Sequence, residues 1–513
     1  MNELKGPPAP NSGLGQTARV GFAWTGMASA LRAVLELGTS VVLARLLVPA
    51  DFGIIAVGQA FLQLSYVVGN LGMGPAIVQA SRLSTVDRRA ATTISIVVAT
   101  LLTVACIVAA PWVAVFFAMP VLRAAMPIMA GEMILSGAAA TPIALLRRDL
   151  QYRRGAIVEI GAGVLYAVMS ITLAWCGYGL WSLVWTPWVA SSWTLLSSHV
   201  MARYRPGLSF DRQALRRLLG FGGALTMKNV FVHLARHSDN LVVAKFLGER
   251  ATGLYTRAFS LSTLPQTRLV ALIYSVAFPA FCRLREDRER FHAWYLKTTS
   301  VAAVVVTPIL LGLVAVAPEF TRVVYGATWT DMATSLRILS LAGLLTALHM
   351  LGGAAIEASG RLRYEVAAQA IYGGMIPCGA ILGARFGIEG VSSAVLVAAI
   401  VFYGTKALAL RKAIGLPIHS FIQAALPALS SGAVMCAIVS AALGALRMAP
   451  SSSLFASPLP RLLAGTLLGA AVYAACLLTL GRTHLRIVKE QIDAFRVGRS
   501  ERAAEALNAS SRA

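Results

Sequence analysis

Residues 218–247, LLGFGGALTMKNVFVHLARHSDNLVVAKFL, constrain the fold more than any other segment. At ~1.5 Å per residue the segment is long enough to cross a membrane, which takes ~20 residues. It nevertheless contains Lys228, Arg236 and Asp239, and each of these costs about 2.5–3.5 kcal/mol at the centre of a bilayer. If all three faced lipid, the cost would be on the order of 8–10 kcal/mol. The segment therefore predicts a membrane helix whose charges face away from lipid.

A helical wheel places the polar side chains of this segment on one face, although Leu225 and Val232 also lie there. Six of them share an arc of roughly 140°, with His237 at its edge: Lys228, Asn229, His233, Arg236, Asp239 and Asn240. The opposite face is almost entirely apolar. We interpret the polar face as the wall of a water-filled cavity inside a helical bundle. The alternative is a buried helix whose ions pair with each other, Arg236 with Asp239 for example, without binding a ligand.

The composition indicates a membrane protein rather than a soluble enzyme. The 513 residues are 57% hydrophobic and 13% charged, whereas soluble domains are about 25% charged. The apolar runs are continuous, which favours an all-α polytopic fold over a β-barrel. The chain contains no GxxxxGK[ST] motif for ATP and no CxxC metal motif, so we expect no cofactor and no metal. The pair His233 and His237 lacks an evident third metal ligand.

Hydropathy predicts about fourteen transmembrane helices. They are expected at about residues 20–47, 53–78, 90–112, 121–146, 155–176, 179–201, 218–247, 252–281, 294–317, 332–358, 364–385, 388–410, 418–446 and 460–481. If the N-terminus is cytoplasmic, the cytoplasmic loops and tails hold 29 of the 45 Lys and Arg residues, and the opposite side holds eight. Positive charge concentrates on the cytoplasmic side of membrane proteins. Both termini are therefore predicted to be cytoplasmic, in a bacterial inner membrane.

An internal repeat divides the chain. Residues 43–47, LARLL, match residues 243–247, VAKFL, and Gly53 matches Gly253, so the offset is 200. Later matches drift slightly, with Tyr152 aligned to Tyr364 and Gly179 to Gly390. An even number of spans in each copy predicts two six-helix lobes related by a pseudo-two-fold axis along the membrane normal, which is a transporter architecture. The expected organisation is a cytoplasmic tail (1–19), an N-lobe (20–203), a basic linker (204–217), a C-lobe (218–411), two added helices (412–481) and an amphipathic cytoplasmic tail (482–513).

Further polar residues concentrate on the first, second and eighth predicted spans. The first span has Arg32 and Glu36 on one face, and the eighth has Arg257 and Arg268 eleven residues apart. The second span contributes Gln59 and Gln63. Two alternatives remain: Arg32 pairs with Glu36 within its helix, or Arg257 and Arg268 extend to the two membrane interfaces.

The predicted cavity is cationic and suits an anion. Its five cations outnumber the two carboxylates, and arginine in particular matches phosphate oxygens; the cations are Arg32, Lys228, Arg236, Arg257 and Arg268. The amides of Gln59, Gln63, Asn229 and Asn240 suit sugar hydroxyl groups. Glu36 and Asp239 are the candidate ion-coupling carboxylates, and His233 and His237 also titrate near neutral pH.

Several motifs carry a family resemblance. Residues 43–79, LARLLVPADFGIIAVGQAFLQLSYVVGNLGMGPAIVQ, resemble the opening of Wzx-type polysaccharide repeat-unit flippases, particularly their colanic-acid-exporter branch. Residues 239–265, DNLVVAKFLGERATGLYTRAFSLSTLP, are similar to the second-half motif of that family. FPAFCRL at 278–284 and YGATW at 325–329 resemble its later landmarks. These proteins belong to the multidrug/oligosaccharidyl-lipid/polysaccharide exporter superfamily.

The resemblance implies a fourteen-helix fold with a central cavity. It also implies a non-enzymatic flippase that moves undecaprenyl-pyrophosphate-linked oligosaccharide across the membrane, driven by an H⁺ or Na⁺ gradient. Membrane lipids and polysaccharide polymerase machinery are the other expected partners, and no nucleic acid is expected. One alternative is a multidrug antiporter of the same fold, against which the excess of cations argues. The other is a membrane polymerase or glycosyltransferase, which would need a large extracytoplasmic loop or acidic catalytic residues at the exit of a span, and the sequence shows neither.

Overall fold

The computed structural model describes residues 13–69, 77, 84–207, 209, 212–448 and 454–480. Within these ranges, the side chains of 13–26, 28–30, 64–69 and 212–236, and of Leu454 and Leu480, are outside the description. Every regular element among the described residues is a helix. The chain divides into two compact units, residues 1–256 and 257–513. The lobe boundaries expected from the sequence stay predictions.

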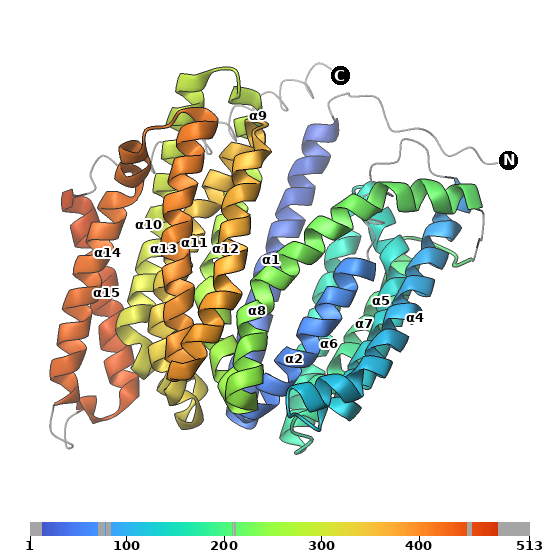
Figure 1. Ribbon diagram of the computed structural model, residues 1–513, viewed down its shortest axis with the longest axis horizontal. Coiled ribbons are helices and arrows are strands. Elements are labelled where there is room, and N and C mark those ends of the chain that lie inside the picture. The colour runs from blue at the N-terminus through green and yellow to red at the C-terminus, as the bar shows by residue number, and fades with distance from the viewer. Residues whose placement is uncertain are drawn as a thin grey trace, which may run out of the picture. The chain divides into compact units, whose positions relative to one another are not determined.

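The first unit is built from long helices that pack in pairs (Figure 1). α4 packs against α5, α6 packs against α7 and α1, and α7 also packs against α5. The helices that lie wholly within this unit are α1 (Gly13–Leu46), α2 (Pro49–Gly69), α4 (Thr85–Phe116), α5 (Leu122–Arg148), α6 (Tyr152–Trp175) and α7 (Trp181–Met201). α8 (Arg212–Pro265) continues into the second unit.

The second unit repeats this pairing. α10 packs against α11, α12 against α13, and α13 also against α11, in the same order as α4, α5, α6 and α7. Its helices are α9 (Ala271–Leu284), α10 (Arg288–Phe320), α11 (Ala333–Ala358), α12 (Leu362–Gly383), α13 (Gly387–Ile414), α14 (Ile418–Arg447) and α15 (Pro458–Leu480). α14 and α15 pack against α10. The internal repeat found in the sequence is therefore a repeat of helix pairing, to which α14 and α15 are added.

The helix boundaries follow from local chemistry. Ser84 and Asp87 form a capping box at the start of α4, in which the Asp87 N–H donates to the Ser84 Oγ at 3.1 Å. α13 ends at Gly415, whose φ of 71° is left-handed and suits glycine. Gly248, with φ 82° and ψ −177°, breaks α8 into two helices. This break separates the predicted seventh and eighth spans.

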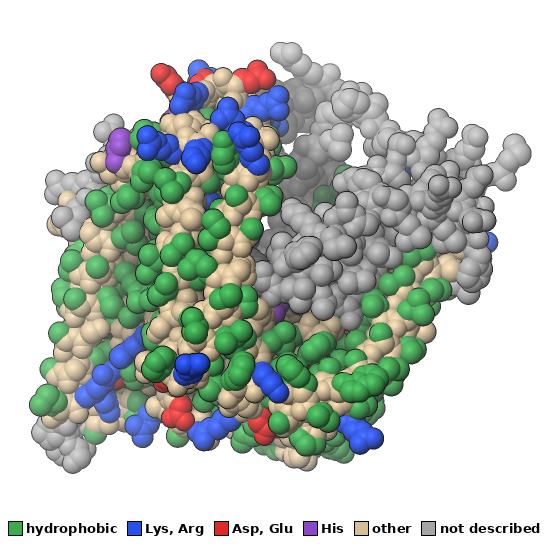
Figure 2. Space-filling model, in the orientation of Figure 1, with side chains coloured by type: hydrophobic (Ala, Val, Ile, Leu, Met, Phe, Trp, Pro, Cys, Tyr) green, Lys and Arg blue, Asp and Glu red, His purple; other side chains and the backbone are tan. Residues whose placement is uncertain are grey.

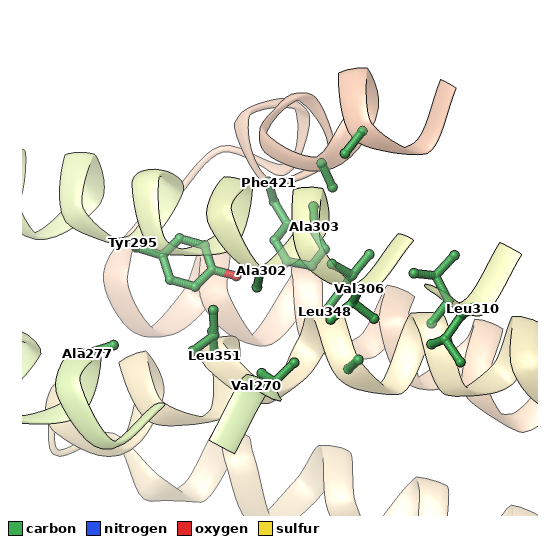
Figure 3. Packing of buried hydrophobic residues seen from close by; sticks show 14 of the residues in the cluster. Val270, Ala277, Tyr295, Ala302, Ala303, Val306, Leu310, Leu348, Leu351 and Phe421 are labelled. Carbon is green, nitrogen blue, oxygen red and sulfur yellow. The ribbon is translucent and has the colours of Figure 1, made fainter. Parts of the chain in front are cut away.

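The core of the second unit combines alanine with larger hydrophobic side chains such as leucine, valine and phenylalanine. Figure 3 shows part of it, with Val306 and Leu348 among the labelled side chains. α11 has many buried Ala, Gly and Ser residues, and a Cβ placed on its Gly343 would lie 2.4 Å from the Ser262 carbonyl oxygen. Small residues allow such close approach of helix backbones in membranes, where lipid leaves little hydrophobic driving force for helix association.

Hydrophobic side chains form a broad band over α12, α13 and α14, with Lys and Arg side chains above and below it (Figure 2). Nine helical segments among the described residues are long and apolar enough to cross a membrane, and some of them join two predicted spans, as residues 362–414 do. The chain is therefore a polytopic membrane protein of helices. The count of fourteen stays a prediction.

Candidate functional site

Asp239 is the predicted site residue with the most specific environment. Its side chain is 1% exposed on α8. The Tyr255 hydroxyl, beyond the break at Gly248, donates to the Asp239 Oδ2 at 2.8 Å, and the Asn240 N–H donates to the Oδ1 at 2.8 Å. A carboxylate inside a membrane protein is costly unless it is paired or has a role with an ion. Among the described residues, both hydrogen-bond donors to this carboxylate are neutral.

Two neighbours of Asp239 on the predicted polar face are also described. His237 is partly buried. The side-chain oxygen of Asn240 is buried and has no hydrogen-bond partner among the described residues. Residues 237–240 therefore combine a buried carboxylate, an imidazole and an available amide oxygen within about one turn of one helix. The side chains of Lys228, Asn229, His233 and Arg236, farther along the same face, lie outside the described residues.

Arg32 and Glu36 form an ion pair within α1. The Arg32 Nε lies 2.8 Å from the Glu36 Oε1, and the two side chains are 50% and 45% exposed. The intrahelical pair that the sequence left open as an alternative is present. An exposed pair of this kind contributes less than about 1 kcal/mol to stability.

The second predicted span starts at a tight backbone contact. A Cβ placed on Gly53 of α2 would lie 1.8 Å from the Glu249 carbonyl oxygen, and a Cβ on Gly253 of α8 would lie 1.8 Å from the Pro49 carbonyl oxygen. The contact is reciprocal and joins two residues that are equivalent in the internal repeat. It fixes the start of α2 against α8, while Gln59 and Gln63 farther along α2 are exposed.

Arg257 and Arg268 are both partly buried in the second unit. The prediction that they share a face assumed a regular α-helix between them. The structure has a π-helical turn at Gln266–Val270, which contains Arg268. A π turn holds more residues than an α turn, so the angle between the two side chains about the helix axis differs from that of the wheel.

Sequence reasoning missed one charged site. Lys406 of α13 is fully buried and donates to the Glu365 Oε2 of α12 in a short hydrogen bond. The Gln369 Nε2 donates to the other Glu365 oxygen at 3.2 Å. A lysine in the middle of an apolar run must have a partner, and this signal was available. The sequence did not show which of several carboxylates would supply it.

The comparisons with known proteins agree with the family resemblance. A model of the family described as polysaccharide biosynthesis protein matches residues 42–334, more than half of the chain. The succinoglycan biosynthesis transport protein ExoT of Rhizobium meliloti (strain 1021) is 27% identical over 61% of this chain, and the match spans 63% of its own length. The lipopolysaccharide biosynthesis protein WzxC of Escherichia coli (strain K12) is 24% identical over 67% of this chain and 70% of its own.

Two solved structures share the fold. The lipid II flippase MurJ, in an inward closed conformation, aligns with a TM-score of 0.69 over 90% of this chain and 100% of its own, at 14% identity. An inward-facing multidrug resistance transporter of the MATE family aligns with a TM-score of 0.59 over 75% of this chain and 94% of its own, at 17% identity. These similarities confirm the polytopic helical fold that the sequence predicted. Together with the match over residues 42–334, they lead to one conclusion: the chain belongs to the polysaccharide biosynthesis protein family.

Proposed function

We propose that the chain is a flippase that moves undecaprenyl-pyrophosphate-linked oligosaccharide repeat units across the bacterial inner membrane. The product would enter exopolysaccharide, capsule or O-antigen assembly. The observation that carries this proposal is the similarity to a relative named as a succinoglycan transport protein. The fold shared with a lipid II flippase over 90% of the chain supports it. A flippase needs no catalytic residue, because no covalent bond changes.

The proposed path is an aqueous cavity that opens alternately to the two sides of the membrane. Arg32, Lys228, Arg236, Arg257 and Arg268 would hold the pyrophosphate, because guanidinium groups bind phosphate oxygens with paired hydrogen bonds. The side-chain amides of Gln59, Gln63, Asn229 and Asn240 would contact the sugar. The lipid tail would stay in the bilayer. The exposed ion pair of Arg32 with Glu36 fits a cation that exchanges partners during transport.

An H⁺ or Na⁺ gradient would supply the energy. Asp239 is a candidate coupling residue, because it is buried and accepts hydrogen bonds from the Tyr255 hydroxyl and the Asn240 N–H. Glu36, His233 and His237 are the other candidates. Both termini would be cytoplasmic, where polysaccharide polymerase machinery, if it binds, would meet the loops and tails.

Export of polysaccharide in a host that lacks this gene tests the proposal. Wild-type protein should restore surface polysaccharide, whereas Arg32→Ala and Arg236→Ala should abolish export at unchanged protein level in the membrane. Arg123→Ala is a matched control, because Arg123 is exposed and outside the proposed path. Absence of export with wild-type protein would refute the flippase function. Wild-type export with both variants would refute only the assignment of the two cations.

A further inference from the structure

The charged cluster between α11, α12 and α13 is larger than one ion pair. The Lys406 side chain is 1% exposed and the Glu365 side chain is 10% exposed. On α11, Glu357 accepts a hydrogen bond from the Tyr274 hydroxyl of α9 at 3.2 Å. Glu357 and Glu365 both act electrostatically on Lys406. The cluster of these three described side chains therefore has two carboxylates and one ammonium, which gives a net charge of −1. One added proton would make it neutral.

The helices around Lys406 are shaped to hold the cluster. A Cβ on Gly353 of α11 would lie 3.2 Å from the Glu365 Oε1, and one on Gly352 would lie 3.4 Å from the Lys406 Cγ. Two consecutive glycines therefore leave the room that the ion pair occupies. On the other side, the Lys406 Nζ lies 4.9 Å from the centre of the Phe402 ring, an orientation that stabilises a cation.

The internal repeat does not require these charges. With the offsets of 212 and 211 found for α6/α12 and α7/α13, Glu365 corresponds to Arg153 and Lys406 to Leu195. The first unit has the same helix pairing without an ammonium–carboxylate pair at these positions. Moreover, replacing a buried ion pair by apolar residues of similar volume is often neutral or stabilising. Folding by itself does not explain why the second unit contains the pair.

The cluster lies near one end of its helices. Glu365 is in the first turn of α12, Glu357 is one residue from the end of α11, and Lys406 is eight residues before the end of α13. At ~1.5 Å per residue, the pair is about 5–12 Å from the helix ends. These ends are the ones predicted to face the cytoplasm.

Four other titratable side chains lie beside the cluster in the described contacts. Tyr274 of α9 donates to Glu357, Tyr295 of α10 lies near Gly352, and the rings of His349 of α11 and Tyr372 of α12 contact Phe402.

We infer that Glu365 and Lys406 form a proton-binding site in the second unit that couples transport to the proton gradient. This inference rests on the proposed flippase function. In the proton-loaded state, a proton from hydronium bonds to a Glu365 carboxylate oxygen and releases one water. The carboxyl group becomes neutral, so its ion pair with Lys406 is lost, and the Glu357 carboxylate remains to balance the Lys406 ammonium. α12 and α13 are then no longer tied by charge, so that proton binding favours a different packing of the two helices. The Lys406 ammonium occupies the place beside the Glu365 carboxylate where Na⁺ would bind. The site therefore takes a proton and not Na⁺.

Infrared difference spectroscopy on the purified full-length protein in lipid nanodiscs tests the site without a substrate. Acidification should produce the carbonyl band of a buried carboxylic acid in the wild type. Glu365→Gln should remove the part of that band that comes from Glu365 and leave the part that comes from any other buried carboxyl group, such as that of Asp239. Glu286→Gln should keep the whole band, because the Glu286 side chain is 88% exposed. A band that is unchanged in Glu365→Gln would overturn the inference.

Export in the host that lacks the gene tests the coupling. The double variant Glu365→Met/Lys406→Met removes both charges at similar volume, so it should reach the membrane in wild-type amounts and lose export. The exchanged pair Glu365→Lys/Lys406→Glu serves as a second variant with the charges retained, and it should export more than the double Met variant. Wild-type export by the double Met variant would overturn the coupling role. If wild-type protein itself gave no export, the flippase function would fail, while the infrared result would still decide whether Glu365 binds a proton.

Discussion

At the scale of single residues, the buried charges of Asp239, Glu319, Glu365 and Lys406 each have a partner from a different helix or from beyond a helix break. Asp239 is bound by Tyr255 across Gly248, and Glu319 at the end of α10 accepts two hydrogen bonds from Arg447 of α14, at 2.7 and 2.8 Å. Unpaired charges in a medium of low dielectric constant are too costly to keep. These partners therefore determine where the charged residues can be tolerated.

Tyr255→Phe should destabilise the protein by about 1–3 kcal/mol, because it removes a hydrogen bond from a buried carboxylate without changing the packing volume. Thermal unfolding of the purified protein in detergent measures the effect. Tyr178→Phe is the control, since Tyr178 is 56% exposed and should show no change. Equal unfolding temperatures for Tyr255→Phe and the wild type would mean that the hydroxyl does not stabilise Asp239.

At the scale of helices, the contact of Gly53 with Gly253 is the feature that depends most on residue size. In each case the atom that a Cβ would meet is a backbone carbonyl oxygen, which cannot move away as a flexible side chain can. The repeat explains why both glycines occur. Two equivalent helix starts meet each other, so each must lack a side chain.

Gly53→Ala and Gly253→Ala should each destabilise the protein, by at least the roughly 1–3 kcal/mol that is typical of overpacking. Gly404→Ala is the matched control, because a Cβ on Gly404 of α13 has nothing within 4 Å, and alanine is favoured over glycine in a helix by up to about 1 kcal/mol. Unfolding temperatures of the three variants give the comparison. If Gly404→Ala unfolds at a temperature no higher than Gly53→Ala and Gly253→Ala do, the close backbone contact between the starts of the two helices is contradicted.

At the scale of the whole molecule, the repeat, the two added helices and the distribution of arginine predict one orientation in the membrane. Two native cysteines can test it. Cys176 follows the end of α6, which is predicted to lie outside, and Cys282 is near the end of α9, which is predicted to lie in the cytoplasm. Both are free and exposed thiols.

Variants that keep only one of these cysteines should label differently in intact spheroplasts. A maleimide reagent that does not cross the membrane should label the protein that retains Cys176, and should label the protein that retains Cys282 only after permeabilisation. The physical reason is the retention of positively charged loops on the cytoplasmic side. The opposite pattern would invert the predicted topology.

The sequence by itself determined that this chain is a helical membrane protein with an internal repeat, and which family it resembles. Hydropathy and glycine positions are local properties: the break at Gly248 and the equivalence of Gly53 with Gly253 are visible in the printed residues. The intrahelical pair of Arg32 and Glu36 also follows from their spacing of four residues.

Only the tertiary structure decided which distant residues meet. A helical wheel places Asp239 on a polar face, but it does not show that Tyr255 returns to it across the break. Lys406 and Glu365 are 41 residues apart on two helices, and their pairing depends on how α12 packs against α13 and on the space that Gly352 and Gly353 leave. Such contacts depend on helix rotation and crossing, to which the whole packed unit contributes, so local sequence patterns do not determine them.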